Sequence, residues 1–420
     1  MPDYAKYTKK IIKFLNNNKQ YVNNKKYDNS YINHLIDIYK NIKTEAQNIT
    51  LVDSDIIKST NNKNNYPSMY TMFKELDLDD VDTSSYNNFL KWFRENFKKV
   101  NLKAVLSNNK KYYDRFFNVS KTKEKLHELL FNNSFIPLDI MHCAEIYDLN
   151  YEEFRNKNTK IYVYSNGSEK PDINFIMNVI TFFRTFTKKN MDMTLVVFYC
   201  NQKKYMPDEK LITSENINSG CTISGEYVYV WRKEEFYKVL IHELVHYFSI
   251  DYHGHDPDVL EHCLHNLFDI EGDDVVNEAY TEIFAVTINS VMRSVDYNIP
   301  FSTIINYENT FTHFQIAKII NLFGGQSYDD LYNITIKQNT SLVSYIIVKG
   351  MLLNNYESII DNLDISSRQY IDYKNIYTQL MNKKSLNDQL INHFLNILKN
   401  KSNSENSDFV VKTLRMTVFG

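Results

Sequence analysis

The chain has 420 residues, of which 43% are hydrophobic and 24% are charged, and its formal net charge is −3. This composition is typical of a globular protein with enough material for one large core or several smaller ones. Proteins dedicated to nucleic acid carry a basic face that neutralises phosphates, so the charge balance argues against that class.

The first residues, MPDYAKYTKKIIKFLNNNK, contain only a short apolar run and no small-residue cleavage site, which argues against a secretory signal. No stretch approaches the roughly eighteen consecutive apolar residues that a membrane span needs. The four cysteines, Cys143, Cys200, Cys221 and Cys263, form no CxxC pair. They predict reduced thiols in an intracellular protein, and a disulfide or a cysteine metal site is the alternative.

Residues 1–155 predict a helical N-terminal domain. SSYNNFLKWFRENFKKV (84–100) spaces apolar side chains at helical intervals behind a serine cap, and KTKEKLHELLFNN (121–133) is similar. The acidic stretch Glu75–Asp82 is expected to be a solvated turn. No recognisable chemistry lies in this segment, so we expect a support domain or one that binds a protein partner.

The pattern changes near residue 156, where strands begin to alternate with helices. β-branched and aromatic runs predict three strands, and a run opened by Pro and Asp predicts a helix between the first two. The strands are KIYVYS (160–165), MDMTLVVFYC (191–200) and GEYVYVWR (225–232), and the helix is PDINFIMNVITFFRTFTKK (171–189).

A strongly apolar helix follows the third strand, and only helices are expected after it. The predicted fold class is therefore α+β and mostly helical. In this prediction the helical domain is followed by a domain over residues 156–420, with a small mixed sheet in 156–255 and a helical half in 256–420.

The apolar helix contains HELVH, with His242 and His246 one helical turn apart, so both imidazoles project from one face. That separation lets both rings bind one Zn²⁺ at about 2.0–2.1 Å. Glu243 is rotated by about 100° and can take a proton from a water molecule that the metal activates. The alternative is a chance match in a buried helix. The apolar neighbours favour the metal site, because buried imidazoles and a carboxylate need a compensating partner.

Two histidines leave a zinc site incomplete, so a third ligand is expected. GDDVVNEAYTEIFAV (272–286) places Glu278 and Glu282 four residues apart on one face of a predicted helix. One carboxylate can bind the metal, and the other can accept the N–H of a ligand histidine. The alternative is a pair of solvent-facing glutamates, in which case His253 becomes the substitute ligand.

HELVH followed by NEAYTE resembles the gluzincin branch of the zincin metallopeptidases, whose thermolysin-like members carry HExxH and NExx(S/T)(D/E). The resemblance implies a zincin-like fold, with an interval between the motifs longer than in thermolysin. It also implies roles for particular residues: His242, His246 and Glu278 as zinc ligands, Glu243 as general base, and Glu282 as a carboxylate outside the ligand set.

The metzincin pattern HExxHxxGxxH is not met, because Ser249 and Tyr252 stand where Gly and the third His are required. Residues of roughly 190–355 are also similar to uncharacterised metallopeptidases of large DNA viruses, which implies the host cytoplasm or the virion as a location. A weaker resemblance, carried by length, HELxH and the Asn/Ile/Tyr bias, is to the light chains of clostridial neurotoxins.

Two further groups of residues are candidates for a role. Tyr345, in TSLVSYIIVKGMLL (340–353), is the expected donor to an oxyanion, with Lys349 as its charge partner. The alternative for Tyr345 is a core position. His262 and His265 could form a second metal site with His253 or His255, or they could decorate a polar helix face.

The predicted function is zinc-dependent hydrolysis of peptide bonds, with one Zn²⁺ per chain and a peptide or protein as substrate. The strand 226–232 is expected to pair with the substrate backbone. One alternative is a zincin-fold structural or virion-associated protein whose zinc is not used for catalysis. The other is a helical interaction protein with an accidental motif.

Overall fold

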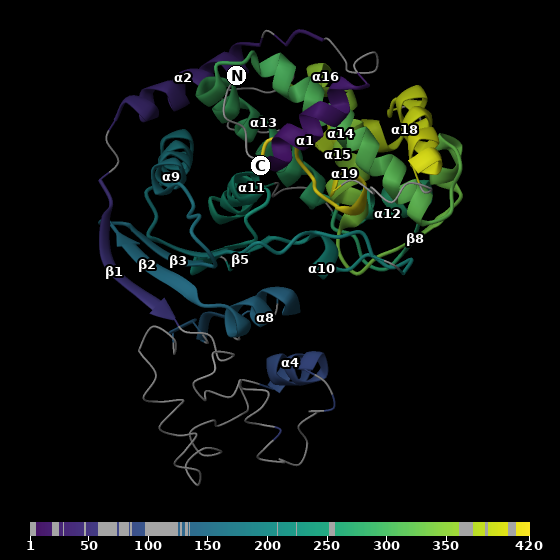
Figure 1. Cartoon of the computed structure of the whole chain (residues 1–420). Helices are drawn as coiled ribbons and strands as arrows, with labels where there is room; N and C mark the ends of the chain where they lie inside the picture. Colours follow the sequence, from purple (N-terminus) through teal and green to yellow (C-terminus); the bar gives the residue numbers. More distant parts are fainter. Residues whose placement is uncertain are drawn as a thin grey trace.

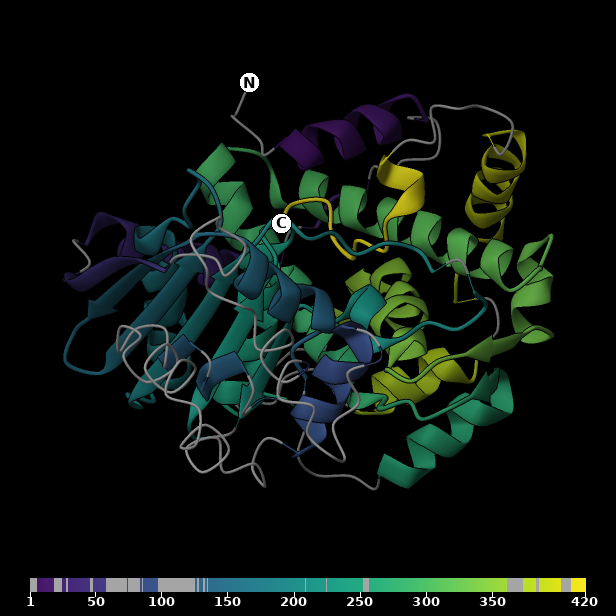
Figure 2. The ribbon, with the colours of Figure 1, turned by 60° about the horizontal axis from the view of Figure 1, so that its bottom comes forward.

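The computed structural model describes residues 6–18, 25–27, 29–45, 48–57, 74, 84, 86–96, 125–126, 128–130, 133, 135–207, 209–223, 225–251, 257–360, 373–382, 385–401 and 409–420. The fold is mixed α/β and mostly helical, as the sequence predicts. Its main sheet has six strands in the order β1-β2-β3-β4-β6-β5. Figure 2 shows these strands gathered on one side, with the long helices of the second half beside them.

The sheet is antiparallel at both edges and parallel in the middle. β1 (Thr50–Ile57), β2 (Leu149–Arg155) and β3 (Thr159–Ser165) pair antiparallel. β4 (Met193–Tyr199) is parallel to β3 and to β6 (Tyr227–Trp231), and β5 (Gly220–Ile223) is antiparallel to β6. β4 is buried on both faces, as expected for a parallel strand covered by helices.

Two strands fall where the sequence predicts helices, so that prediction is wrong for residues 50–57 and 149–155. The segment LNYEEFR is polar enough to read as a surface helix, but in β2 its alternate side chains are buried against the sheet. β1 is exposed along most of its length and gains its order from pairing with β2. The division of the chain at residue 155 stays a prediction.

Side chains of the sheet alternate between two apolar layers. On one face Ile161, Leu195 and Val228 pack with α9 (Ile173–Thr187) and α11 (Phe236–Tyr247). On the other face Tyr164 and Phe198 pack with α8 (Leu138–Ile146). Figure 1 shows α9 and α11 on one side of the sheet and α8 on the other. The period of two is the one expected of a sheet that is buried on both faces.

The second half of the chain is built mainly from helices, as predicted. The expected helices are α12 (Pro257–Leu267), α13 (Asn277–Tyr297), α14 (Phe301–Leu322), η4 (Val343–Val348) with α15 (Lys349–Asn354), α17 (Tyr373–Leu380) and α18 (Asp388–Lys401). The shorter elements of this half are η3 (Tyr328–Tyr332), α16 (Tyr356–Ile360) and α19 (Phe409–Lys412), while α10 (Ser214–Ile217) lies between β4 and β5. The expectation of helices alone is wrong at β7 (Asp269–Glu271) and β8 (Thr335–Lys337), which pair in parallel.

Segments far apart in the sequence meet around α13 and α14. α1 (Lys6–Asn16) packs on α14, and α2 (Ser30–Thr44) packs on α9 and α13. α4 (Tyr86–Asn96), another predicted helix, packs on α8. The side chains of Thr413–Phe419, named here the 413–419 segment, are all buried.

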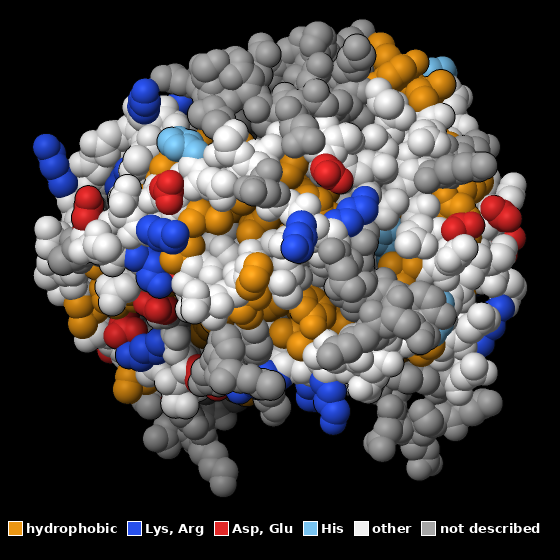
Figure 3. All heavy atoms as spheres, turned by 90° about the horizontal axis from the view of Figure 1, so that it is seen from above, with side chains coloured by type: hydrophobic (Ala, Val, Ile, Leu, Met, Phe, Trp, Pro, Cys, Tyr) orange, Lys and Arg blue, Asp and Glu red, His pale blue; other side chains and the backbone are white. Residues whose placement is uncertain are grey.

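Two surface features bear on partners. On the face seen in Figure 3, basic side chains are dispersed among acidic and uncharged ones. Within the ranges that the structure describes, no helix has the length and apolar character needed to cross a membrane.

Candidate metal centre

The HELVH motif lies in α11, which is buried on nearly all sides. The helix packs on β5 and β6 on one side and on α13 on the other. It begins after Glu235, a buried residue with a left-handed backbone (φ 62°). His242 and Glu243 are 6% and 5% exposed, so their polar side chains require partners within the protein.

Three of the predicted residues bring their ligand atoms together. His242 Nε2 lies 3.2 Å from His246 Nε2, and Glu278 Oε2 lies 3.2 Å from the first nitrogen and 3.5 Å from the second. Two ligand atoms at 2.0–2.1 Å from a tetrahedral zinc are separated by roughly 3.3–3.4 Å. The three atoms therefore have the spacing of ligands around one such ion, and no other cluster of metal-ligating side chains is found among the described residues.

Each ligand histidine faces a carboxylate with its other nitrogen. His242 Nδ1 lies 2.8 Å from Glu282 Oε1, and His246 Nδ1 lies 3.0 Å from Asp251 Oδ2. A carboxylate at Nδ1 assigns the proton of a neutral imidazole to that atom and leaves a lone pair on Nε2. The lone pairs of the two Nε2 atoms and the oxygen of Glu278 then point toward one another with no hydrogen-bond donor among them. A bound cation would stabilise this arrangement.

The charges of the two glutamates agree with this arrangement. Burial raises the pKa of Glu278, but protons on His242 and His246, which take the place of a cation when no metal is bound, outweigh burial and hold the pKa well below its usual range. Burial also raises the pKa of Glu282, and the ammonium groups of Lys238 and Lys349 outweigh it. Both carboxylates are therefore charged at neutral pH, which a metal ligand and its outer partner require.

Glu243 lies in the same cleft but outside the ligand set. The Thr222 hydroxyl lies 2.9 Å from Glu243 Oε2, to which it can donate. A Cβ at Gly220 would lie 2.6 Å from Glu243 Oε1, so only glycine allows the carboxylate this close to β5. Burial is the largest influence on the Glu243 carboxylate and raises its pKa. A carboxylate with a raised pKa is better suited to accept and return a proton.

The cleft has a volume of about 410 Å³, and Tyr345 is part of its lining. The ring centroid of Tyr345 lies 6.0 Å from that of His242. Burial, and then the charges of Glu278 and Glu243, raise the pKa of Tyr345 well above its usual value, so its hydroxyl keeps its proton. Tyr345 lies in η4, a π-helical turn, and such turns are frequent at functional sites.

The turn that carries Tyr345 is fixed by Asp274. The Asp274 carboxylate accepts hydrogen bonds from the backbone N–H of Ser344, at 3.2 Å, and from the Ser344 hydroxyl. Lys349, which was expected to be the charge partner of Tyr345, instead lies with its Nζ 3.5 Å from Glu282 Oε2. α15 thus directs Lys349 toward Glu282, and Lys349 is not part of the lining of the cleft.

The strand that was predicted to pair with the substrate backbone, residues 226–232, is not at the edge of the sheet. β6 lies between β4 and β5 and pairs with both, so its backbone groups are already used. β5 is the edge strand on this side of the sheet, and its residues Gly220, Cys221 and Thr222 line the cleft. The sequence signal for β5 is weak, since the strand has only four residues and contains a glycine.

His262 and His265 are exposed on α12 and do not join the site. His253 and His255 lie outside the described residues, as does the acidic stretch 75–82. The four cysteines are free thiols. Four residues of the site had not been singled out from the sequence: Asp251, Thr222, Gly220 and Lys238. Asp251 follows a chain reversal at Ser249 (φ 50°), which no local pattern indicates.

No family model, curated protein or solved structure matches this chain. The chemistry of the site itself therefore carries the functional inference.

Proposed function

We propose that the protein is a zinc-dependent peptidase. The observation that carries this proposal is the convergence of His242 Nε2, His246 Nε2 and Glu278 Oε2, with a carboxylate at the Nδ1 of each histidine. Two imidazoles and one carboxylate are a frequent ligand set of catalytic zinc, and a fourth position is then open to water or substrate.

The chain's own residues supply the proton transfers. A zinc ion held by the three ligands would supply Lewis-acid activation of water and of a carbonyl group. Glu243, beside the ligands, accepts the proton of the attacking water and donates it to the leaving amine. The Tyr345 hydroxyl, which keeps its proton, donates a hydrogen bond to the oxygen on which negative charge develops.

Edge strand β5 is the element on which an extended substrate can lie. Its backbone pairs with β6 on one side only, and the other side borders the cleft that holds Glu243. A peptide added to such an edge gains main-chain hydrogen bonds whatever its side chains are. The substrate class that suits this site is therefore a peptide or an extended segment of a protein.

Metal analysis and a peptide-library digest test the proposal together. The wild type is expected to hold one zinc per chain and to cleave peptides, and His242→Ala or His246→Ala to lose both properties. His262→Ala is the matched control, because that histidine is exposed on α12.

Glu243→Gln separates catalysis from metal binding. It is expected to keep the zinc and to lower turnover by several orders of magnitude, because only proton transfer is lost. Cleavage by Glu243→Gln at the wild-type rate would remove Glu243 from the mechanism. Stoichiometric zinc without any cleavage would support the structural or virion-associated role instead.

A further inference from the structure

The 413–419 segment crosses the core behind the metal site, and charged side chains hold its backbone N–H groups. Glu308, on α14, accepts from the N–H of Val418 and of Phe419, each at 3.1 Å. Glu235, immediately before α11, accepts from the N–H of Thr417 at 2.6 Å. Both glutamates are buried, so these donors provide the hydrogen bonds that water would otherwise make.

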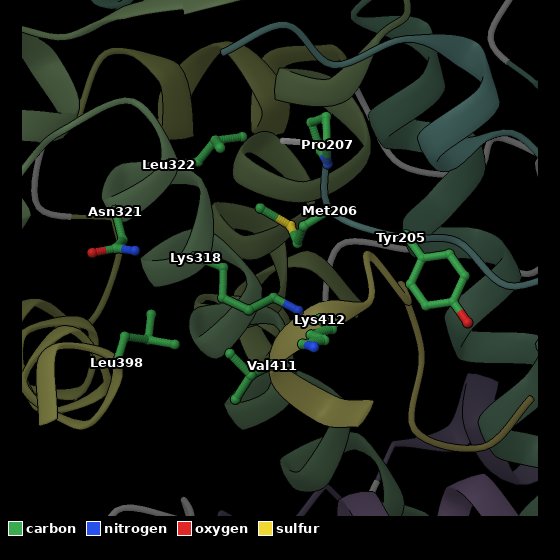
Figure 4. Close-up of a pocket in the computed structure, with 9 residues that line it drawn as sticks. All are labelled: Tyr205, Met206, Pro207, Lys318, Asn321, Leu322, Leu398, Val411 and Lys412. Atoms are coloured by element: carbon green, nitrogen blue, oxygen red, sulfur yellow. The ribbon is translucent and has the colours of Figure 1, made fainter. Parts of the chain in front are cut away.

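Two buried lysines hold carbonyl groups at the same end of the chain. Lys349 donates to the Met416 carbonyl at 2.9 Å. Lys318, on α14, donates to the Val410 carbonyl at 3.0 Å and also to the Thr413 carbonyl. Lys318 lines a separate cavity of about 570 Å³ with Lys412 and residues of α14, α18 and the 205–207 stretch (Figure 4). The two lysines thus make the same kind of contact in different surroundings.

Only Lys349 reaches the metal site. Its Nζ lies 3.5 Å from Glu282 Oε2, while Glu282 Oε1 contacts His242 Nδ1 at 2.8 Å and the ammonium of Lys238. Each oxygen of the Glu282 carboxylate is therefore within ion-pair distance of a different lysine, and the contact with Lys349 is an ion pair without a hydrogen bond. Met416 also lines a small cavity of about 30 Å³ together with His242 and Glu282. An uninterrupted chain of contacts runs from the 413–419 segment to a ligand histidine.

We propose that the 413–419 segment is a positioning element of the metal site and acts on His242 through Lys349 and Glu282. This inference rests on the proposed function. The Met416 carbonyl fixes the ammonium of Lys349, and Lys349 fixes the rotation of the Glu282 carboxylate. That carboxylate in turn fixes the ring of His242, and loss of such an outer partner costs about 10–100-fold in metal affinity.

Lys349→Met and Lys318→Met form a matched pair for the test. Both changes remove a buried ammonium that holds a carbonyl of residues 410–416, but only the first removes a contact with Glu282. Zinc affinity is measured in competition with a chromogenic chelator, and circular dichroism verifies that each variant is folded. Lys349→Met is expected to bind zinc about tenfold more weakly, and Lys318→Met within about twofold of the wild type. Equal affinities in the two variants would overturn the inference.

A double variant tests whether Lys349 acts through Glu282. Once Glu282→Gln has weakened zinc binding, adding Lys349→Met is expected to weaken it no further, because both changes break the same chain of contacts. Additive losses would mean that Lys349 influences the site by another route, and the inference would fall.

Amide hydrogen exchange in the wild type provides a test that needs no variant. Coupling between two sites is reciprocal, so zinc must stabilise the 413–419 segment if the segment positions the zinc site. Zinc is expected to slow exchange at Met416–Phe419 at least tenfold more than in the remote β1–β2 ladder. Equal slowing in both places would contradict the inference.

A wild type without zinc affinity would overturn the proposed function as well, whereas unchanged affinity in Lys349→Met would overturn the inference alone.

Discussion

At the scale of single residues, Glu278 and Glu282 show what spacing can and cannot predict. Local periodicity predicts that both lie on one face of α13, and the structure shows that this face meets α11. The roles proposed for them differ because each meets a different atom of His242: Nε2 for Glu278 and Nδ1 for Glu282. A sequence pattern does not predict how an imidazole ring is rotated. Asp251 was missed for a related reason, since its position follows from the left-handed turn at Ser249.

Zinc titration of two variants tests this difference in role. Glu278→Gln is expected to bind zinc too weakly to retain it, because an amide oxygen carries no charge to offset that of the metal. Glu282→Gln is expected to keep the metal with about 10–100-fold lower affinity, since only an outer partner is lost. Dissociation constants from chelator competition decide the matter, and reversed effects would exchange the two roles.

Gly220→Ala tests the close approach of Glu243 to β5. The new Cβ would lie 2.6 Å from Glu243 Oε1, so the carboxylate must move while the three ligands stay in place. A displacement of about 1 Å at a reacting group costs on the order of 100-fold in rate, so kcat should fall by about that factor with zinc retained. Gly325→Ala is the control, because its Cβ would lie 2.5 Å from Ile320 Cγ2, a comparable crowding at a residue that does not line the cleft. Equal losses of activity in both variants would assign the effect to general destabilisation.

At the scale of elements, the strands and helices with a strong hydrophobic periodicity were predicted correctly. Elements whose conformation depends on pairing with other segments were not. α9, α11 and β4 have dense apolar patterns because they are buried on most sides. β1 and β2 are more polar, and their state depends on pairing with strands elsewhere in the chain. The contact between α14 and α18 is another long-range feature. His313, on α14, accepts from the N–H of Asn387 at 3.1 Å, next to the start of α18.

The stability of this contact is expected to depend on pH through His313. Burial lowers its pKa from 6.5 to about 4. As the pH falls from about 6.5 to about 4, the unfolded chain binds a proton that the folded chain does not, so the stabilising contribution present above pH 6.5 is lost. The shift corresponds to about 3 kcal/mol. The free energy of unfolding of wild type and of His313→Gln can be measured with denaturant at several pH values. The difference between the two proteins should become smaller as the pH falls. A difference independent of pH would contradict the assignment.

At the scale of the whole molecule, the sequence did not predict which distant segments share a core. Residues of α1 and α2 pack on α14, α9 and α13, and the 413–419 segment lies buried among charged residues of α14 and α15. These contacts join positions that lie far apart in the sequence, and neither periodicity nor composition predicts them. The predicted separation of a helical N-terminal domain (1–155) from the rest of the chain (156–420) therefore needs an experiment of its own.

Leu35→Ala in α2 tests whether that separation holds. Leu35 is 0% exposed, and its truncation is expected to cost about 2–5 kcal/mol of unfolding free energy. The chain has two tryptophans, so in a Trp92→Phe background Trp231 in β6 reports on the sheet alone. If α2 folds as one unit with α9, α13 and the sheet, Leu35→Ala shifts the fluorescence and far-ultraviolet circular dichroism midpoints by the same amount. A shift confined to the helical signal, with an unchanged Trp231 transition, would mean that the N-terminal segment unfolds as an independent domain.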